Sequence, residues 1–157
     1  GEPVLRRLNP LGGVSRITVH HEGHKNPVRF TDVRSSGERM ELIRKWHLQR
    51  GFGDIGYHYV VDRAGRIWEG RSRRFQGAHV RKNNERNLGV MVLGNFDKQQ
   101  PSSAQIAVVN DLLPQLSRTY GVPTHRIYTH QELMPTTCPG STLQAHMVNL
   151  RRSRALG

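Results

Sequence analysis

The sequence has only one cysteine, Cys138, among its 157 residues. An internal disulfide is therefore excluded, and the redox compartment stays open. The chain also has no apolar run long enough to cross a membrane as a helix, no internal repeat and no low-complexity block. Acidic residues are scarce, with 12 Asp and Glu against 24 Lys and Arg, so the formal net charge is +12. Such a surface attracts polyanions.

The positive charge alone does not identify the polyanion. Nucleic acid, anionic lipid and acidic cell-wall polymers all qualify. A nucleic-acid partner is not expected, because the sequence has no zinc-finger spacing, recognition-helix pattern or aromatic-rich strand. Teichoic acid, peptidoglycan carboxylates or lipid phosphates of an outer membrane account for the charge equally well.

The order of apolar segments predicts a single α/β domain over residues 15–157, preceded by an extended lead-in over residues 1–14. Apolar or alternating segments indicate strands at 16–21, 57–62, 66–69, 88–93 and 126–130. Helical spacing indicates helices at 37–49, 102–120 and 143–152. Because strands and helices alternate, we expect one mixed central β-sheet flanked by helices.

Local signals set the expected helix ends. Ser35 or Ser36 is expected to cap the first helix. Ser102 and Gln105 resemble a capping box that opens the second helix. Pro114 is expected to kink that helix or to split it in two.

Two of the nine histidines stand out by position. His20 ends the apolar run 16–20, and His130 ends the run 126–130. If the two strands are neighbours, their ends bring the two side chains to one point. His21 would point to the opposite side of its strand, since side chains alternate, so only one of the adjacent pair can join a given site.

Cys138 lies in the loop sequence Thr-Thr-Cys-Pro-Gly, a short distance after His130. A lone cysteine is often an inert buried residue, but a loop position argues against that interpretation. Two imidazoles and one thiolate are enough to hold a zinc ion with its fourth position open, which is the ligand count of a catalytic site. The spacing alone leaves both interpretations open.

These residues and their neighbours closely resemble a known family, the zinc N-acetylmuramoyl-L-alanine amidases of the phage lysozyme type together with the animal peptidoglycan recognition proteins. The resemblance spreads over residues 17–140 in the order of the family. The matching stretches are Ile17-Thr-Val-His-His21, Asp54-Ile-Gly-Tyr-His-Tyr59, 62–71 (Asp-Arg-Ala-Gly-Arg-Ile-Trp-Glu-Gly-Arg), Gly77-Ala-His79, 87–94 (Asn-Leu-Gly-Val-Met-Val-Leu-Gly), Thr129-His-Gln-Glu132 and Cys138-Pro-Gly140.

The resemblance implies a zinc ion on His20, His130 and Cys138, at the floor of a surface groove. Tyr57 matches the tyrosine that lines the zinc site in the family. Phage members carry a lysine two residues before the metal cysteine, whereas this chain has Thr136 there, as catalytic recognition proteins do. Family members that only recognise peptidoglycan commonly lack the cysteine, so its presence favours catalysis.

The implied reaction hydrolyses the amide between the lactyl group of N-acetylmuramic acid and the L-alanine of the peptidoglycan stem peptide. The alternative is a non-catalytic or weakly catalytic peptidoglycan-binding receptor. Tyr57 is expected to orient the zinc water or to stabilise the oxyanion, and Thr136 to add a hydroxyl hydrogen bond. The group that protonates the departing amine stays open between Tyr57, a zinc-bound water and His79.

Substrate contacts are expected from the groove walls. His79 is expected to contact sugar or peptide, and Asn95 to offer its amide to the peptide backbone. Arg71 and Arg81, with Arg73 and Arg74, are expected to meet stem-peptide carboxylates, which arginine binds bidentately.

The expected partners are peptidoglycan or muropeptides, with anionic cell-envelope polymers attracted to the basic surface. We expect a monomer that acts in the periplasm or outside the cell. A cytoplasmic phage-type endolysin is the alternative.

Overall fold

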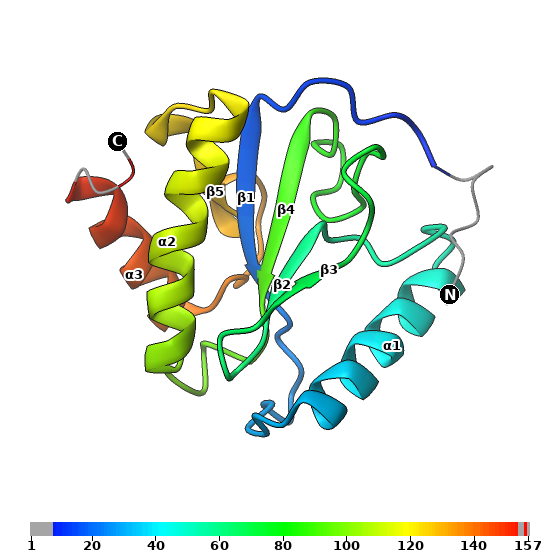
Figure 1. Ribbon diagram of the computed structural model, residues 1–157, viewed down its shortest axis with the longest axis vertical. Helices are drawn as coiled ribbons and strands as arrows, with labels where there is room; N and C mark the ends of the chain where they lie inside the picture. Colours follow the sequence, from blue (N-terminus) through cyan, green and yellow to red (C-terminus); the bar gives the residue numbers. More distant parts are fainter. Residues whose placement is uncertain (1–7, 154–155, 157) are drawn as a thin grey trace.

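The computed structural model describes residues 8–153 and Leu156, which form five strands, three α-helices and two short 3-10 turns (Figure 1). The strands are β1 (Arg16–His21), β2 (Tyr59–Val61), β3 (Ile67–Glu69), β4 (Asn87–Val92) and β5 (Ile127–Thr129). The helices are α1 (Val33–Gln49), α2 (Ser103–Tyr120) and α3 (Ser141–Arg152), and the 3-10 turns are η2 (Thr124–Arg126) and η3 (His130–Glu132). No helix in this described part is long and apolar enough to span a bilayer.

The strands form one mixed sheet in the order β3-β2-β4-β1-β5. The pairs β2–β4, β4–β1 and β1–β5 are parallel, and β3 pairs antiparallel with β2. Strands β1 and β4 lie at the centre and are buried along nearly their whole length. The predicted single α/β domain with a mixed, helix-flanked sheet is therefore confirmed for the described residues.

Helices α2 and α3 cover one face of the sheet, and α1 covers the other (Figure 1). Ile17 and Val19 point into the larger core, with Leu113 from α2 and Leu143 from α3. Thr18 and His20 alternate with them and therefore point to the face that α1 covers. The period of the strand thus decides on which face a polar side chain of β1 emerges.

Helix α1 begins earlier than the apolar spacing predicts. It starts at Val33, and its N-cap is Asp32, whose carboxylate accepts a hydrogen bond from the Ser35 amide at 2.8 Å. The predicted caps Ser35 and Ser36 are therefore wrong. The first turn was missed because the regular apolar spacing begins only at Met40. The helix starts one turn earlier than predicted because the Asp32 side chain binds a backbone amide of that first turn.

Helix α2 begins as predicted. The Ser102 hydroxyl accepts from the Gln105 amide at 3.0 Å, and the Gln105 side chain accepts from the Ser102 amide at 3.0 Å, which completes the capping box. Pro114 does not split the helix, which runs unbroken to Tyr120. Packing of the surrounding apolar face against the sheet outweighs the single backbone hydrogen bond that proline removes.

The predicted lead-in over residues 1–14 lies partly outside the described residues. From residue 8 onward it packs against the domain. Pro10 forms an isolated bridge with Phe75, and the Leu11 amide donates to the Arg74 carbonyl at 3.0 Å. The side chains of Leu11 and Val14 are buried in the larger core.

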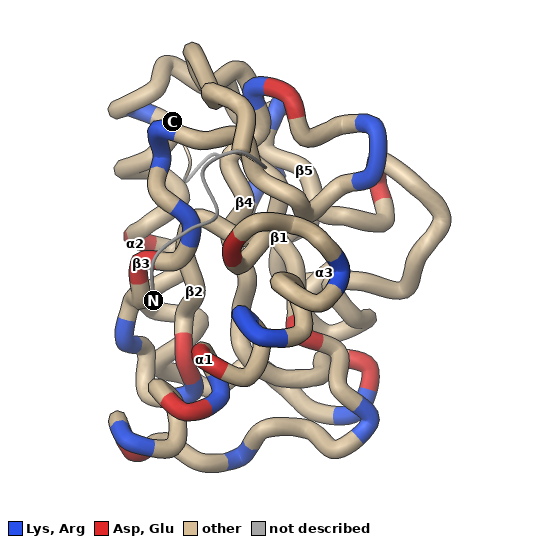
Figure 2. The backbone as a smooth tube through the Cα atoms, turned by 90° about the vertical axis from the view of Figure 1, so that its right-hand side faces the viewer, with Lys and Arg blue, Asp and Glu red and all other residues tan. Residues whose placement is uncertain are grey.

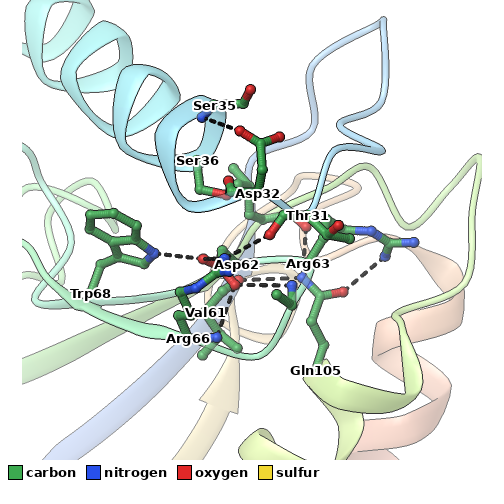
Figure 3. A network of polar contacts seen from close by, with 12 residues as sticks. Thr31, Asp32, Ser35, Ser36, Val61, Asp62, Arg63, Arg66, Trp68 and Gln105 are labelled. Carbon is green, nitrogen blue, oxygen red and sulfur yellow. Dashed lines mark hydrogen bonds and ion pairs between the residues drawn. The ribbon is translucent and has the colours of Figure 1, made fainter.

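The turn between β2 and β3 closes on one buried carboxylate, that of Asp62 (Figure 3). Its Oδ1 accepts from the backbone amides of Ala64 at 3.0 Å and Arg66 at 2.9 Å. Its Oδ2 accepts from the indole Nε1 of Trp68 at 2.8 Å and from Nη1 of Arg66 at 3.2 Å. Arg66 Nη1 also donates to the Thr31 carbonyl at 2.7 Å, which ties the turn to the segment that precedes α1.

Replacing Asp62 with alanine is expected to lower the free energy of unfolding by about 3 kcal/mol, because three neutral donors lose their acceptor at roughly 1 kcal/mol each. Urea denaturation measures the change. Asp111→Ala on α2 is the control, since that carboxylate makes an exposed bond to Gln115. If Asp62→Ala lowered the free energy of unfolding by no more than Asp111→Ala does, the Asp62 hydrogen bonds would not stabilise the fold as predicted.

Candidate metal centre

His20 lies near the carboxyl end of β1, with a side chain that is 1% exposed on the α1 face of the sheet. The adjacent His21 takes the other direction. Its Nδ1 accepts a hydrogen bond from the Phe96 amide at 3.1 Å, on the side of the larger core. The prediction that only one histidine of this pair joins the site is therefore confirmed.

His130 follows the last residue of β5, where the chain turns into η3. Because β5 lies beside β1 in parallel register, with Val19 opposite Thr129, the next residue of each strand comes together. The ring centroids of His20 and His130 are 4.6 Å apart. The expected meeting of the two strand ends is confirmed.

The turn that carries His130 is held by Glu132. The Glu132 carboxylate accepts from the Thr129 amide at 2.9 Å and from both terminal nitrogens of Arg151 at 2.6 Å. Arg151 lies in the last turn of α3 and also donates to the Ile127 carbonyl at 2.9 Å. A helix at the far end of the chain thus braces the turn beside the site.

Cys138 reaches the same point from the loop after η3. Its Sγ lies 3.6 Å from Nδ1 of His20 and accepts from the His21 amide at 3.4 Å. The loop is fixed at both ends, since the Gln131 amide donates to the Cys138 carbonyl at 2.9 Å and the Cys138 amide donates to Oγ1 of Thr136 at 3.2 Å.

The three side chains fit a zinc ion. One ligand atom from each of His20, His130 and Cys138 lies within 4.8 Å of the others. The Sγ–Nδ1 separation of 3.6 Å between Cys138 and His20 matches the roughly 3.6 Å between sulfur and nitrogen ligands around one tetrahedral zinc. Nε2 of His130 is buried and has no hydrogen-bond partner among the described residues. A metal ion bound by the three side chains would satisfy this nitrogen.

Burial also sets the charge of this cluster. It lowers the pKa of His20 well below its usual value, and the neighbouring His79 and His130 lower it further. Burial likewise lowers the pKa of His130 and raises that of the Cys138 thiol to about 12. The imidazoles are therefore neutral, which is the form that binds a metal ion.

A surface cavity of about 550 Å³ opens beside the cluster. Tyr57 and His130 line it, and the Tyr57 ring lies 5.2 Å from that of His20. Burial raises the pKa of Tyr57, with Cys138 and Glu22 adding to the shift, so its hydroxyl stays protonated and can donate a hydrogen bond. The remaining lining residues are His47, Arg50, Phe52, Ala78, His79, Arg81, Lys82, Asn84 and Met134.

Two of the residues expected to bind substrate line this cavity. Arg81 is exposed at its rim. His79 is 8% exposed, and both its ring nitrogens are engaged: Nδ1 with Nε2 of His20 at 2.8 Å, and Nε2 with the Asn87 carbonyl at 2.9 Å. His79 therefore offers the cavity no free ring nitrogen.

The other two lie elsewhere. Arg71 is 4% exposed and donates to the carbonyls of Phe52, Asp54, Ile55 and Gln76 at 2.7 to 3.1 Å. The expected contact of Arg71 with substrate carboxylates has no support in this geometry, because four backbone acceptors already bind the guanidinium.

Asn95 braces a loop outside the lining of the cavity. Its side chain donates to the His24 carbonyl at 3.1 Å and accepts from the Asp97 amide at 3.1 Å. The expected contact between its amide and a peptide backbone therefore has no support in this arrangement, in which both polar atoms of the side chain bind the protein.

Two cations that the sequence did not single out also line the cavity. Arg50 follows α1 with its guanidinium 4.6 Å from the centroid of the Phe52 ring, and Lys82 has a left-handed backbone with φ of 65°. With Arg81 they place three exposed cations on the lining, and no acidic residue is among its described members. The sequence feature that could have drawn attention to Arg50 is its position at the end of a helix, directly before Gly51-Phe-Gly53.

Comparisons with known proteins agree with this geometry. A family profile described as N-acetylmuramoyl-L-alanine amidase matches residues 10–141. A human N-acetylmuramoyl-L-alanine amidase is 35% identical over 146 residues, which is 91% of this chain and 24% of the relative. The endolysin of Enterobacteria phage K11 is 34% identical over 107 residues, which is 65% of this chain and 70% of the endolysin.

A solved structure shares the fold as well. The peptidoglycan recognition protein SD of Drosophila superposes with a TM-score of 0.79 at 25% identity, covering 88% of this chain and 82% of the recognition protein. The chain spans only about a quarter of the length of the mammalian amidases that it resembles.

Proposed function

The chain belongs to the N-acetylmuramoyl-L-alanine amidase family, and from that premise we propose that it is a zinc-dependent amidase. It would hydrolyse the amide between the lactyl group of N-acetylmuramic acid and the L-alanine of the stem peptide. The observation that carries the proposal is the convergence of His20, His130 and Cys138 beside the cavity that Tyr57 lines.

An unactivated amide resists water at neutral pH, and the three ligands would hold the group that overcomes this. A zinc ion supplies a Lewis acid for the carbonyl oxygen and lowers the pKa of water toward 7. The buried neutral imidazoles and the sulfur of Cys138 are the donor types that zinc prefers.

Tyr57 is the proposed hydrogen-bond donor to the substrate. As the amide carbon becomes tetrahedral, its oxygen gains negative charge, and a protonated hydroxyl at the cavity wall can stabilise that charge. Thr136 is the second proposed donor. Its Oγ1 already accepts from the Cys138 amide, which leaves the hydroxyl hydrogen available to the substrate.

The cavity cations suit the carboxylates of a stem peptide. Arg81, Arg50 and Lys82 would attract an anionic peptide, with arginine able to bind a carboxylate through two parallel hydrogen bonds. They replace Arg71 in the role that the sequence suggested.

Among the described residues, Lys and Arg occur on many separate segments rather than on one element, as the blue stretches in Figure 2 show. A diffuse positive charge favours loose retention on anionic envelope polymers over a single recognition face. Such retention would suit a protein that acts at the cell envelope, in the periplasm or outside the cell.

Chelation tests the proposal. Dialysis against a strong zinc chelator is expected to reduce release of stem peptide from purified muropeptides to background, and one equivalent of zinc per chain should restore it. Mass spectrometry of the digest identifies the free peptide and the sugar that retains its lactyl group.

Two other results are informative. Undiminished hydrolysis by the metal-free protein would rule out the zinc mechanism. Tight binding of muropeptides by the zinc-loaded protein, without any free stem peptide, would instead support the alternative of a peptidoglycan-binding receptor.

A further inference from the structure

A chain of hydrogen bonds runs from the metal centre to the backbone of the central strand. Nδ1 of His20 faces Sγ of Cys138, while Nε2 of the same ring lies 2.8 Å from Nδ1 of His79. The other nitrogen of His79, Nε2, lies 2.9 Å from the carbonyl oxygen of Asn87, the first residue of β4. Each ring nitrogen of His79 and Nε2 of His20 is therefore used inside the protein.

The direction of these bonds follows from the last acceptor. A carbonyl oxygen can only accept, so Nε2 of His79 carries the hydrogen. A neutral imidazole carries a single ring hydrogen, so with that hydrogen on Nε2 the Nδ1 of His79 is an acceptor. Nε2 of His20 must then donate to it, which leaves the lone pair of His20 on Nδ1, the atom that faces Cys138.

The His79 ring has little freedom to leave this position. A Cβ atom at Gly77 would lie 2.5 Å from Cδ2 of His79, and one at Gly89 would lie 2.8 Å from the same atom. Two glycines on different segments therefore provide the space that the ring fills. The backbone at His79 is fixed as well, because its amide donates to Oδ1 of Asn84 at 2.8 Å.

The final acceptor is equally rigid. The Asn87 side chain accepts from the Thr18 hydroxyl at 2.8 Å and donates to the Asn83 carbonyl at 2.8 Å. Asn87 is also paired with Arg16 across the β4–β1 ladder. The hydrogen bonds therefore end on Asn87, a fully buried residue of the central strand β4.

We propose that His79 is a positioning residue, which fixes the tautomer and the ring orientation of His20 so that the Nδ1 lone pair points to the shared metal site. The role rests on the proposed function only in that the bound group is a zinc ion. Its test measures the metal and the ring of His20, so that it can fail or succeed independently of amide hydrolysis.

The competing role is the substrate contact that the sequence suggested. A residue that only touches sugar or peptide affects KM and leaves zinc affinity unchanged. A residue that orients a ligand changes zinc affinity before any substrate is present. Groups that orient metal ligands in this way typically alter metal affinity by about 10- to 100-fold.

The first experiment measures zinc affinity by competition with a chromophoric chelator. His79→Leu keeps much of the ring volume but removes the acceptor, and we expect its zinc Kd to rise by about 10- to 100-fold. His79→Asn places an amide oxygen near the position of Nδ1 and is expected to recover most of the affinity. His146→Leu on α3, where the histidine contacts Asn110, is the matched control and should bind zinc as the unchanged protein does.

The second experiment needs neither metal nor substrate. Nitrogen-15 chemical shifts of the His20 ring in the metal-free protein are expected to show hydrogen on Nε2 and none on Nδ1. In His79→Leu we expect a mixture of tautomers. Because the unchanged protein is itself a readout, a His79→Leu chain that fails to fold does not remove the test.

Either of two results overturns the proposal. One is a His20 ring that carries its hydrogen on Nδ1 in the unchanged metal-free protein. The other is a folded His79→Leu protein with unchanged zinc affinity, especially if its KM alone rises. Weakened zinc binding in a protein without amidase activity would sustain the positioning role while rejecting the proposed function.

Discussion

Replacing Cys138 with serine is expected to reduce amide hydrolysis by more than about 10³-fold while the fold and muropeptide binding persist. Enzymes accelerate such reactions by 10⁶-fold or more, and the sulfur is one of only three ligands that would hold the catalytic ion. A serine hydroxyl can still accept from the His21 amide, which now donates to Sγ at 3.4 Å. It is a far weaker zinc ligand than a thiolate.

The measurement is a muropeptide digest followed by mass spectrometry, together with zinc content and calorimetric binding of the same muropeptide. Thr137→Ser is the control, because it changes a neighbouring exposed residue of the same loop and leaves the three ligands untouched. A serine variant that hydrolyses as fast as the control would remove Cys138 from the metal site.

Replacing Tyr57 with phenylalanine is expected to lower kcat by about 10²- to 10³-fold, the usual effect of removing one hydrogen-bond donor to a developing oxyanion. The ring stays in place against His20, so zinc affinity and KM should change little. The result would separate Tyr57, which acts on the substrate, from His79, which acts through a ligand.

Steady-state kinetics on a defined muropeptide measures this effect, with Tyr128→Phe on β5 as the control for loss of a tyrosine hydroxyl. If Tyr57→Phe retained full kcat, the donor would have to be Thr136, from the loop that carries Cys138, or a different residue that lines the cavity. If zinc affinity fell instead, Tyr57 would be a structural neighbour of His20.

The sequence predicted that His20 and His130 would meet because their positions follow from strand geometry, while the family resemblance implied that they and Cys138 bind a metal. His20 and His130 each end a buried apolar run, and adjacent parallel strands bring such ends together. Cys138 was identified by being the only cysteine and by its loop context. Neither inference required knowledge of side-chain contacts.

The substrate contacts were harder to predict because they depend on how loops fold. Arg71 looked like a groove cation, but its acceptors come from carbonyls at 52–55 and 76, which no local pattern reveals. Arg50 and Lys82 reach the cavity through a helix end and a left-handed backbone position. The sequence could place cations in these loops but could not say which of them face the cavity.

The brace between Arg151 and Glu132 bears on where a functional domain of this kind ends. The match to the amidase family profile ends at residue 141, ten positions before the guanidinium that steadies the His130 turn. A fragment that ends at residue 141 would keep His20, His130 and Cys138 but lose Arg151, which binds Glu132 in the turn that carries His130. A fragment that keeps the proposed site intact must therefore extend to the last turn of α3, beyond the residues that match the family profile.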